Sequence, residues 1–210
     1  YPPSILFLIK DFLFAFHAYF LFHHILLMTS VYGLCRYWKK SVQASLCASV
    51  TSLLGGYFLS LASVYNHFQS AVWFPLILMM WQKYRVKGSL KYFCWAAIFI
   101  SFQVLGGGPE NSIFSVLLIY AHSIYLYEEK DKIHGFVKKS LAILVLVGMA
   151  LALSAVQWLP TFAFLKEIAR GSGLNYATST HWSLNPNTLL DLLLPENYMR
   201  FLESTDREMD

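Results

Sequence analysis

The side chains that could do chemistry in this sequence lie within or beside long apolar stretches. The densest set is residues 106–110, where three glycines and a proline interrupt a helical pattern directly before Glu110. Irregular backbone in a membrane is tolerated only where it lines a cavity or packs against protein. Two interpretations of Glu110 follow. It either stabilises the start of the next helix, where the helix dipole favours an acid, or lines a pocket for a polar ligand.

A second set of polar residues follows the last apolar stretch. It consists of Gln157, Lys166, Glu167 and Arg170. If this segment is helical, Glu167 and Arg170 share one face and form a modest surface ion pair. The alternative is that Arg170 binds a phosphate, a task suited to its planar guanidinium, with Lys166 as a second cation.

Histidines give a third set. His17 and His24, in the first apolar stretch, are two helical turns or about 10 Å apart, which is too far for both to bind one metal ion. The sequence has no zinc-type spacing, no P-loop and no nucleophile motif. We therefore expect no metal and no bound cofactor. His67 and Gln69, in a short polar segment between apolar stretches, are further candidates for substrate binding.

The composition restricts the class of protein that positions these residues. Of the 210 residues, 57% are hydrophobic and 13% are charged, whereas soluble domains carry about 25% charged residues. This balance excludes a soluble domain, a disordered chain and a nucleic-acid-binding protein, and it indicates an integral membrane protein.

The apolar stretches predict an all-α, polytopic bundle of about six transmembrane spans, because about 20 apolar residues cross a bilayer. The domain of residues 1–160 holds them at about 12–34, 41–62, 70–83, 90–105, 112–127 and 140–160. Glycines at 55–56 and 106–108 predict broken helices or re-entrant loops on the outer side. Residues 161–210 are predicted to be an extracytoplasmic loop region with a short interfacial helix at about 186–194.

Lysine and arginine are concentrated in alternate loops. Eleven of the sixteen lie at residues 36–40, 83–91 and 130–139, while the loops near Tyr65 and Gly107 hold none. Since basic residues mark cytoplasmic loops, this pattern places Tyr1 and residues 161–210 on the extracytoplasmic side.

Short motifs also occur in a characteristic order along the whole chain. They are Tyr1-Pro2-Pro3, His23-His24, Gly55-Gly56-Tyr57, Trp73-Phe74-Pro75-Leu76, Gly108-Pro109-Glu110, Gln157-Trp158-Leu159-Pro160, Arg170 and Trp182-Ser183-Leu184-Asn185-Pro186. This order resembles the YfhO-like bacterial membrane proteins, which are assigned to the GT-C class of glycosyltransferases. Two positions depart from the family pattern: Ala163 stands where a Glu is frequent, and Ile168 where a Ser is frequent.

The resemblance implies a function and a location. Such an enzyme would transfer a sugar from a polyprenyl-phosphate donor to a polymer or glycolipid acceptor of the cell envelope, on the outer face of the bacterial cytoplasmic membrane. It also implies that the chain is an internal piece whose acidic catalytic base lies before Tyr1, so that no catalytic residue falls within this chain. Glu110, Arg170, Lys166 and their neighbours would then bind substrate.

Two other functions fit the same residues. A transporter or lipid flippase would use the helix breaks at 55–56 and 106–109 as substrate sites. A non-catalytic scaffold of an envelope pathway would need the packing of the helices but not the side chains of Glu110 and Arg170.

Overall fold

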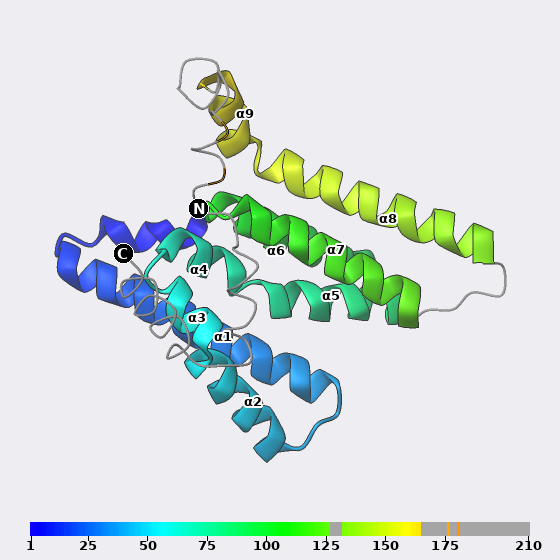
Figure 1. Ribbon diagram of the computed structural model, residues 1–210, viewed down its shortest axis with the longest axis horizontal. Helices are drawn as coiled ribbons and strands as arrows, with labels where there is room; N and C mark the ends of the chain where they lie inside the picture. Colours follow the sequence, from blue (N-terminus) through cyan, green and yellow to red (C-terminus); the bar gives the residue numbers. More distant parts are fainter. Residues whose placement is uncertain (127–131, 165–175, 177–179, 181–210) are drawn as a thin grey trace, which may run out of the picture. The chain divides into compact units, whose positions relative to one another are not determined.

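The computed structural model describes residues 1–126 and 132–164, together with Tyr176 and Thr180 (Figure 1). In this part of the chain all regular elements are helices, which confirms the all-α prediction. The chain divides into two units, Tyr1–Pro160 and Thr161–Asp210. The elements are η1 Pro2–Leu8, α1 Phe12–Tyr37, α2 Val42–Leu54, α3 Gly56–Leu61, α4 Tyr65–Ala71, α5 Phe74–Lys87, α6 Leu90–Leu105, α7 Pro109–Leu126, α8 Lys132–Leu153 and α9 Ala155–Phe164.

Local sequence explains where several of these helices begin and end. Asp11 caps α1 by accepting a hydrogen bond from the backbone N–H of Phe14 at 3.0 Å, and Ser41 caps α2 in the same way from Ala44 at 3.1 Å. In the turn that joins α5 to α6, Gly88 adopts the left-handed conformation with φ 66°, which ends α5.

Three segments are long and apolar enough to cross a membrane: Phe12–Tyr37, Val42–Leu61 and Phe136–Leu153. They indicate a helical membrane protein. The second contains α2 and α3, which Gly55 separates by adopting an extended conformation with ψ 141°, so the predicted helix break at this position is confirmed. The shorter apolar helix α6 has the predicted bounds. The arrangement with six spans stays a prediction.

The predicted helix at 70–83 is wrong at its start. Residues 65–71 form the separate helix α4, and α5 begins only at Phe74. Proline explains the boundary, because Pro75 has no N–H to donate to the carbonyl of Ala71 but fits well in the first turn of a new helix. A short helix therefore precedes α5 where a continuous span was expected.

The continuous helix predicted at 140–160 is wrong in two respects. It begins earlier, at Lys132, and it is interrupted at Ser154 between α8 and α9. Side chains bind the last carbonyl groups of α8. The Ser154 hydroxyl donates to Ala150 at 2.8 Å, and the Trp158 indole donates to Leu151 at 2.8 Å. Side-chain bonds of this kind compete with the helical backbone ladder and bend or end it.

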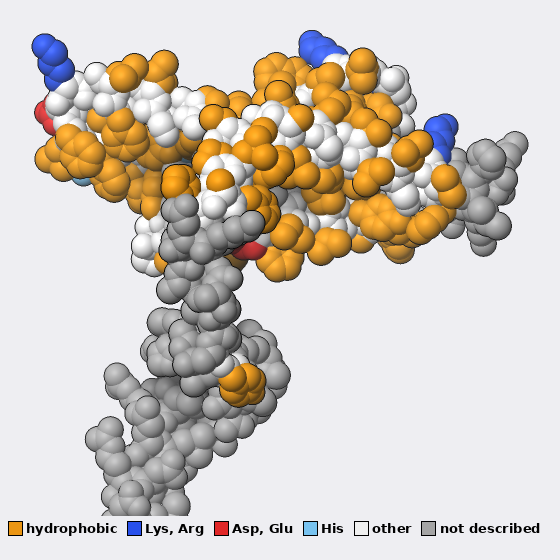
Figure 2. Space-filling view, turned by 90° about the horizontal axis from the view of Figure 1, so that it is seen from above, with side chains coloured by type: hydrophobic (Ala, Val, Ile, Leu, Met, Phe, Trp, Pro, Cys, Tyr) orange, Lys and Arg blue, Asp and Glu red, His pale blue; other side chains and the backbone are white. Residues whose placement is uncertain are grey.

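Polar and apolar residues are distributed in the manner of membrane helices. Large apolar side chains are exposed along α1 and α7, and Figure 2 shows hydrophobic side chains spread across the visible described surface with few charged ones among them. The buried positions hold many small polar residues, which are Ser30, Ser45, Ser49, Ser70, Ser101, Ser112, Ser115, Ser123 and Ser154. Small residues let membrane helices approach closely and hydrogen-bond across their interfaces. One example is Ser49, which donates from α2 to the carbonyl of Met28 in α1 at 2.9 Å.

The core of the first unit lies where α5, α6, α7 and α8 pack together. Trp81 of α5 is fully buried there, and its indole N–H donates to the hydroxyl of Ser123 in α7 at 2.6 Å. Ile77, Ile119 and Leu146 belong to the same cluster. These contacts hold α5, α7 and α8 together, and α7 carries Glu110 in its first turn.

We expect Trp81→Ala to lower the free energy of unfolding by about 3–5 kcal/mol, because it removes a large buried side chain and leaves a cavity. Trp95→Ala in α6 is the matched control, since 43% of that tryptophan is exposed and its loss leaves no internal cavity. Unfolding by denaturant in detergent micelles measures both variants. Equal losses in the two variants would contradict this description of the core.

Candidate functional site

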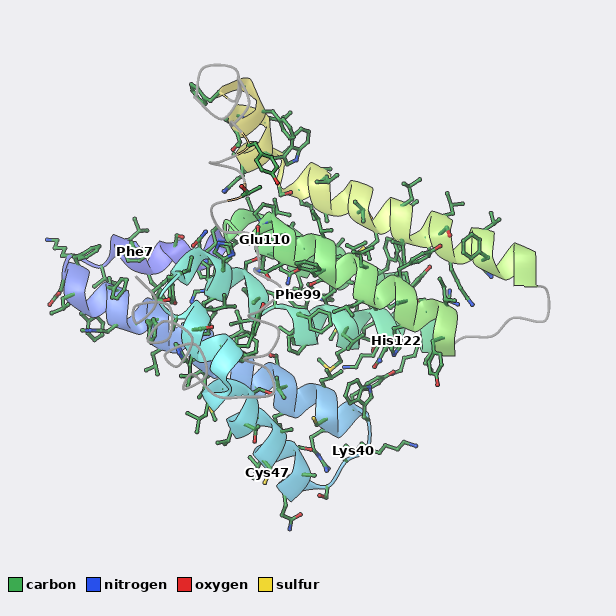
Figure 3. All side chains as sticks on the ribbon, in the orientation of Figure 1. Phe7, Lys40, Cys47, Phe99, Glu110 and His122 are labelled. Atoms are coloured by element: carbon green, nitrogen blue, oxygen red, sulfur yellow. The ribbon has the colours of Figure 1, made fainter. Side chains whose placement is uncertain are left out.

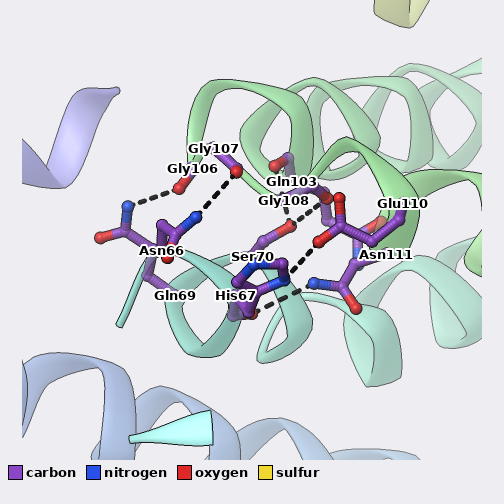
Figure 4. Close-up of polar contacts among 10 residues, drawn as sticks. All are labelled: Asn66, His67, Gln69, Ser70, Gln103, Gly106, Gly107, Gly108, Glu110 and Asn111. Carbon is purple, nitrogen blue, oxygen red and sulfur yellow. Dashed lines mark hydrogen bonds and ion pairs between the residues drawn. The ribbon is translucent and has the colours of Figure 1, made fainter. Parts of the chain in front are cut away.

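The helix α4 is attached to the turn between α6 and α7, whose residues 106–108 we call the glycine turn (Figure 4). Asn66 donates from its side-chain amide to the carbonyl of Gly107 at 3.2 Å, and Gln69 donates to that of Gly106 at 2.5 Å. The Ser70 hydroxyl lies 2.8 Å from the carbonyl of Gln103 and 2.9 Å from that of Gly108. The last carbonyl groups of a helix have no hydrogen-bond donors within the helix, and side chains of α4 serve as their donors here.

Glycine is required in this turn because α4 lies so close to it. A Cβ atom on Gly108 would lie 2.8 Å from the Cβ of Ser70 and 2.8 Å from the side-chain nitrogen of Asn111. Gly107 has φ 87°, a conformation that other residues rarely adopt. The three glycines seen in the sequence therefore serve a close helix-to-turn contact.

A second polar network joins the start of the chain to α1, α4 and α5. The Tyr1 hydroxyl lies 2.7 Å from Nε2 of the fully buried His23, and it accepts a hydrogen bond from the indole of Trp73 at 2.9 Å. Nδ1 of His23 lies 2.7 Å from the carbonyl of Tyr19, which can only accept. Nδ1 therefore carries the hydrogen, and Tyr1 donates to Nε2.

The ionisation of the two tyrosines outside the spanning helices is unfavourable in this network. Burial raises the pKa of the Tyr1 hydroxyl far above its usual range, although the bond from Trp73 opposes the shift. Burial likewise raises the pKa of Tyr65. Both hydroxyls therefore stay protonated and act as hydrogen-bond donors. Together with the buried, neutral histidine, they make this network suited to fixing helices.

Gln69 connects the two networks. Its Oε1 accepts a hydrogen bond from the Tyr19 hydroxyl at 2.5 Å, while its Nε2 donates to Gly106. One side chain thus links α1 to the glycine turn through α4.

Glu110 and His67 form the accessible part of the site. Oε1 of Glu110, in the first turn of α7, contacts Nδ1 of His67 in α4. The two side chains are 43% and 36% exposed, respectively. Asn111 donates from its side chain to the carbonyl of His67 at 3.2 Å, which further ties α4 to α7. Glu110 combines a position favoured by the helix dipole with a specific side-chain partner.

The structure therefore brings three of the predicted residues, Glu110, His67 and Gln69, to one side of the glycine turn. Figure 3 shows Glu110 at the end of α7 next to this turn, whereas His122 lies toward the other end of the same helix. Gln157 is exposed on α9, outside this group. Lys166, Glu167 and Arg170 lie outside the described residues, as does the predicted interfacial helix at 186–194.

The sequence interpretation missed most of the residues that hold the site together. They are Tyr1, Tyr19, Tyr65, Asn66, Ser70, Gln103 and Asn111. A signal was present, since polar residues at 66, 67, 69 and 70 share one face of a helix.

Gln103, at the end of α6, is fully buried, and within the described part of the chain neither atom of its amide has a hydrogen-bond partner. Ser112 in α7 is also buried with no partner for its hydroxyl among the described residues. Leaving a buried polar group unpaired costs about 1–3 kcal/mol.

Searches of protein-family models, of curated protein sequences and of solved structures find no match for this chain.

We expect Gly108→Ala to destabilise the protein by about 1–3 kcal/mol, because the added methyl group overlaps Ser70 and Asn111. Gly148→Ala is the matched control. Nothing lies within 4 Å of a Cβ at that position in α8, and alanine is the better helix former. Thermal unfolding in detergent should show a loss of stability for the first variant and no loss for the second. A tolerated Gly108→Ala would mean that α4 does not pack this closely on the turn.

The same substitution at two glutamines should have opposite effects. Gln69→Met removes the bonds to Tyr19 and Gly106 and should lower stability by about 1–3 kcal/mol. Gln103→Met replaces an unpaired buried amide by an apolar group of similar shape and should raise stability by about 1 kcal/mol. Unfolding curves of both variants test this, and destabilisation by Gln103→Met would show that its amide is bonded in the working protein.

Proposed function

We propose that this chain is a membrane-embedded part of a glycosyltransferase of the GT-C class, which transfers a sugar from a polyprenyl-phosphate donor to an acceptor of the bacterial cell envelope. The observation that supports the proposal most is the exposed pair of Glu110 and His67, held beside the glycine turn at one end of α6. The basic residues Lys87 and Lys91 flank the other end of this helix, about 24 Å away along its axis.

This separation suits an enzyme that works on one face of a membrane. Six spans with basic loops at the cytoplasmic side would place the glycine turn at the extracytoplasmic side. The lipid tail of the donor would lie between helices there, and its phosphate would lie at the interface. Arg170 and Lys166 supply positive charge for the phosphate, which gains negative charge as the sugar leaves. Glu110, His67 and Gln69, with Gln157 and Glu167, bind the sugar or the acceptor.

We expect the substitution Arg170→Ala, made in the complete gene product that carries this chain, to lower sugar transfer at least about 100-fold, since it removes charge from the leaving phosphate. The assay follows a radiolabelled sugar from polyprenyl phosphate into the envelope fraction of membrane vesicles. Arg200→Ala, an arginine later in the same unit, is the matched control and should retain the activity. Unchanged transfer by Arg170→Ala, with the protein present at normal levels, would refute the assignment.

One observation favours a non-catalytic scaffold as the second candidate. Asn66, Gln69 and Ser70 all bind backbone carbonyl groups, so most of the polar face of α4 has a structural role. A scaffold would tolerate loss of the Arg170 charge but not the overlap introduced by Gly108→Ala. Comparing the growth of cells that carry each variant separates the two functions.

A further inference from the structure

We propose that the first unit binds the phosphate group of an anionic phospholipid at a cluster of Lys83, Lys87, Tyr37 and Tyr92, which we call the lysine–tyrosine cluster. It lies at the end of α6 opposite the glycine turn, and the proposed glycosyltransferase function makes no use of it. The inference therefore stands apart from the proposed function, and failure of one leaves the other in place.

The lysine–tyrosine cluster lies where the ends of α1, α5 and α6 meet. The indole of Trp38, directly after α1, donates to the side-chain oxygen of Gln82 in α5 at 2.8 Å. The ammonium group of Lys83, the next residue of α5, lies 5.4 Å from the ring centroid of Tyr37 in α1. It also lies 5.9 Å from the ring centroid of Tyr92 in α6. Lys83 is partly buried, so its charge is held between two helices rather than spread into solvent.

The positive charge of the cluster has no neutralising acid within the described part of the chain. A second ammonium, that of Lys87, lies 5.5 Å from the ring centroid of Tyr92. Tyrosine rings attract cations but carry no net charge. The acids among the described residues are Asp11 at the start of α1 and Glu110 at the start of α7. Further basic residues flank the cluster, among them Arg36, Lys39, Lys40 and Lys91. This surface therefore suits an anion.

The position of the cluster favours an anion that belongs to a membrane. The first segment that is apolar enough to cross a bilayer ends at Tyr37 itself. Trp38 follows it and is 44% exposed, and tryptophan is enriched at membrane–water interfaces. Basic residues at this depth attract anionic headgroups. A zwitterionic headgroup is less suitable, because its own cation would meet lysines and no described carboxylate.

One face of α6 provides a surface for the acyl chains next to the cluster. Tyr92, Trp95 and Phe99 follow one another on this face over about 10 Å of the helix. The rings of Trp95 and Phe99 are stacked with their centroids 5.5 Å apart, and Trp95 is 43% exposed. A phospholipid whose phosphate contacts the lysines can place a chain along these rings, whereas a soluble phosphate has no group to place there. The two surfaces together assign the site to a lipid.

The first arm of the test measures the affinity for a defined lipid. The complete gene product that carries this chain is titrated in detergent with phosphatidylglycerol, and native mass spectrometry gives the apparent Kd. We expect Lys83→Gln combined with Lys87→Gln to weaken binding about 25-fold, since each basic residue at a membrane surface contributes a factor of about five. Lys83→Arg combined with Lys87→Arg keeps both charges and should retain the lipid. Loss of binding in the arginine variant would overturn a site built on charge.

Lys39→Gln combined with Lys40→Gln is the matched control. It removes the same two charges from the turn after α1, where neither ammonium lies over an aromatic ring of the described residues. The control should weaken binding far less than the substitution of Lys83 and Lys87. Equal losses would show that the lipid is attracted by diffuse charge and would overturn the site. Unchanged affinity after the loss of Lys83 and Lys87 would overturn it too, because other groups would then neutralise these lysines.

Two further arms test the lipid chains and the fold. An excess of glycerol 3-phosphate should not displace phosphatidylglycerol, and displacement would show that the phosphate alone is recognised. Trp95→Ala should weaken binding, and an unchanged Kd would overturn the role of the aromatic face. Size-exclusion chromatography in detergent without added lipid reports whether each variant is folded. If the combined glutamine variant is not, Lys87→Gln alone carries the test, since Lys87 is exposed on α5, and it should weaken binding about fivefold.

Discussion

The arrangement of this site depends on one requirement: the carbonyl groups at the end of α6 need hydrogen-bond donors. The glycine turn that follows α6 leaves the carbonyls of Gln103, Gly106 and Gly107 without donors from the helical backbone, whereas the carbonyl of Gly108 accepts from the backbone N–H of Asn111 at 3.1 Å. Three side chains on one face of the short helix α4 bind this turn: Asn66 donates to Gly107, Gln69 donates to Gly106, and the single hydroxyl hydrogen of Ser70 lies within reach of the carbonyls of Gln103 and Gly108. The position of His67 beside Glu110 follows from this docking, because His67 lies on the same face of the same helix. The reactive candidates are thus placed by residues whose own task is to pair backbone groups.

The rest of the first unit follows the physics of helices in lipid. With apolar side chains outside and small polar side chains inside, the helices gain little from the hydrophobic effect and hold together by close packing and interhelical hydrogen bonds. Trp81 with Ser123, and Ser49 with the backbone of Met28, are bonds of this type. The same rule explains why the aromatic network of Tyr1, His23 and Trp73 is fully hydrogen-bonded although it lies among apolar residues. A buried polar group without a partner is costly, so the side chains of Gln103 and Ser112, which have none among the described residues, are exceptions.

The sequence predicted the helical class, the bounds of α6, the break at Gly55 and the interruption of the helix at residues 106–108, because each rests on a strong local signal. Apolar length identifies a helix in lipid, and glycines or prolines mark its interruption. The prediction failed at α4, where the apolar pattern runs on although Pro75 marks the start of a new helix. It also failed at Ser154, where the indole of Trp158 bonds to a carbonyl seven residues earlier. The polar network at Tyr1 was equally inaccessible, since its partners are 22 and 72 residues apart in sequence. Glu110 was singled out from its place beside the glycines, but its contact with His67 could be identified only once α4 was known to be a helix.

The two bonds of Gln69 have a consequence for which residues can stand at this position. The oxygen of its amide faces a hydroxyl donor and its nitrogen faces a carbonyl acceptor, so the amide has a single permitted orientation. Glutamate would place an oxygen against the carbonyl of Gly106, and asparagine would be one methylene too short to reach both partners. Glutamine at this position is therefore tied to the hydroxyl of Tyr19 in α1 and to the backbone carbonyl of Gly106 in the glycine turn. Homologous sequences that keep this architecture should keep Gln69 and Tyr19 together or exchange them together, because their side chains bond to each other.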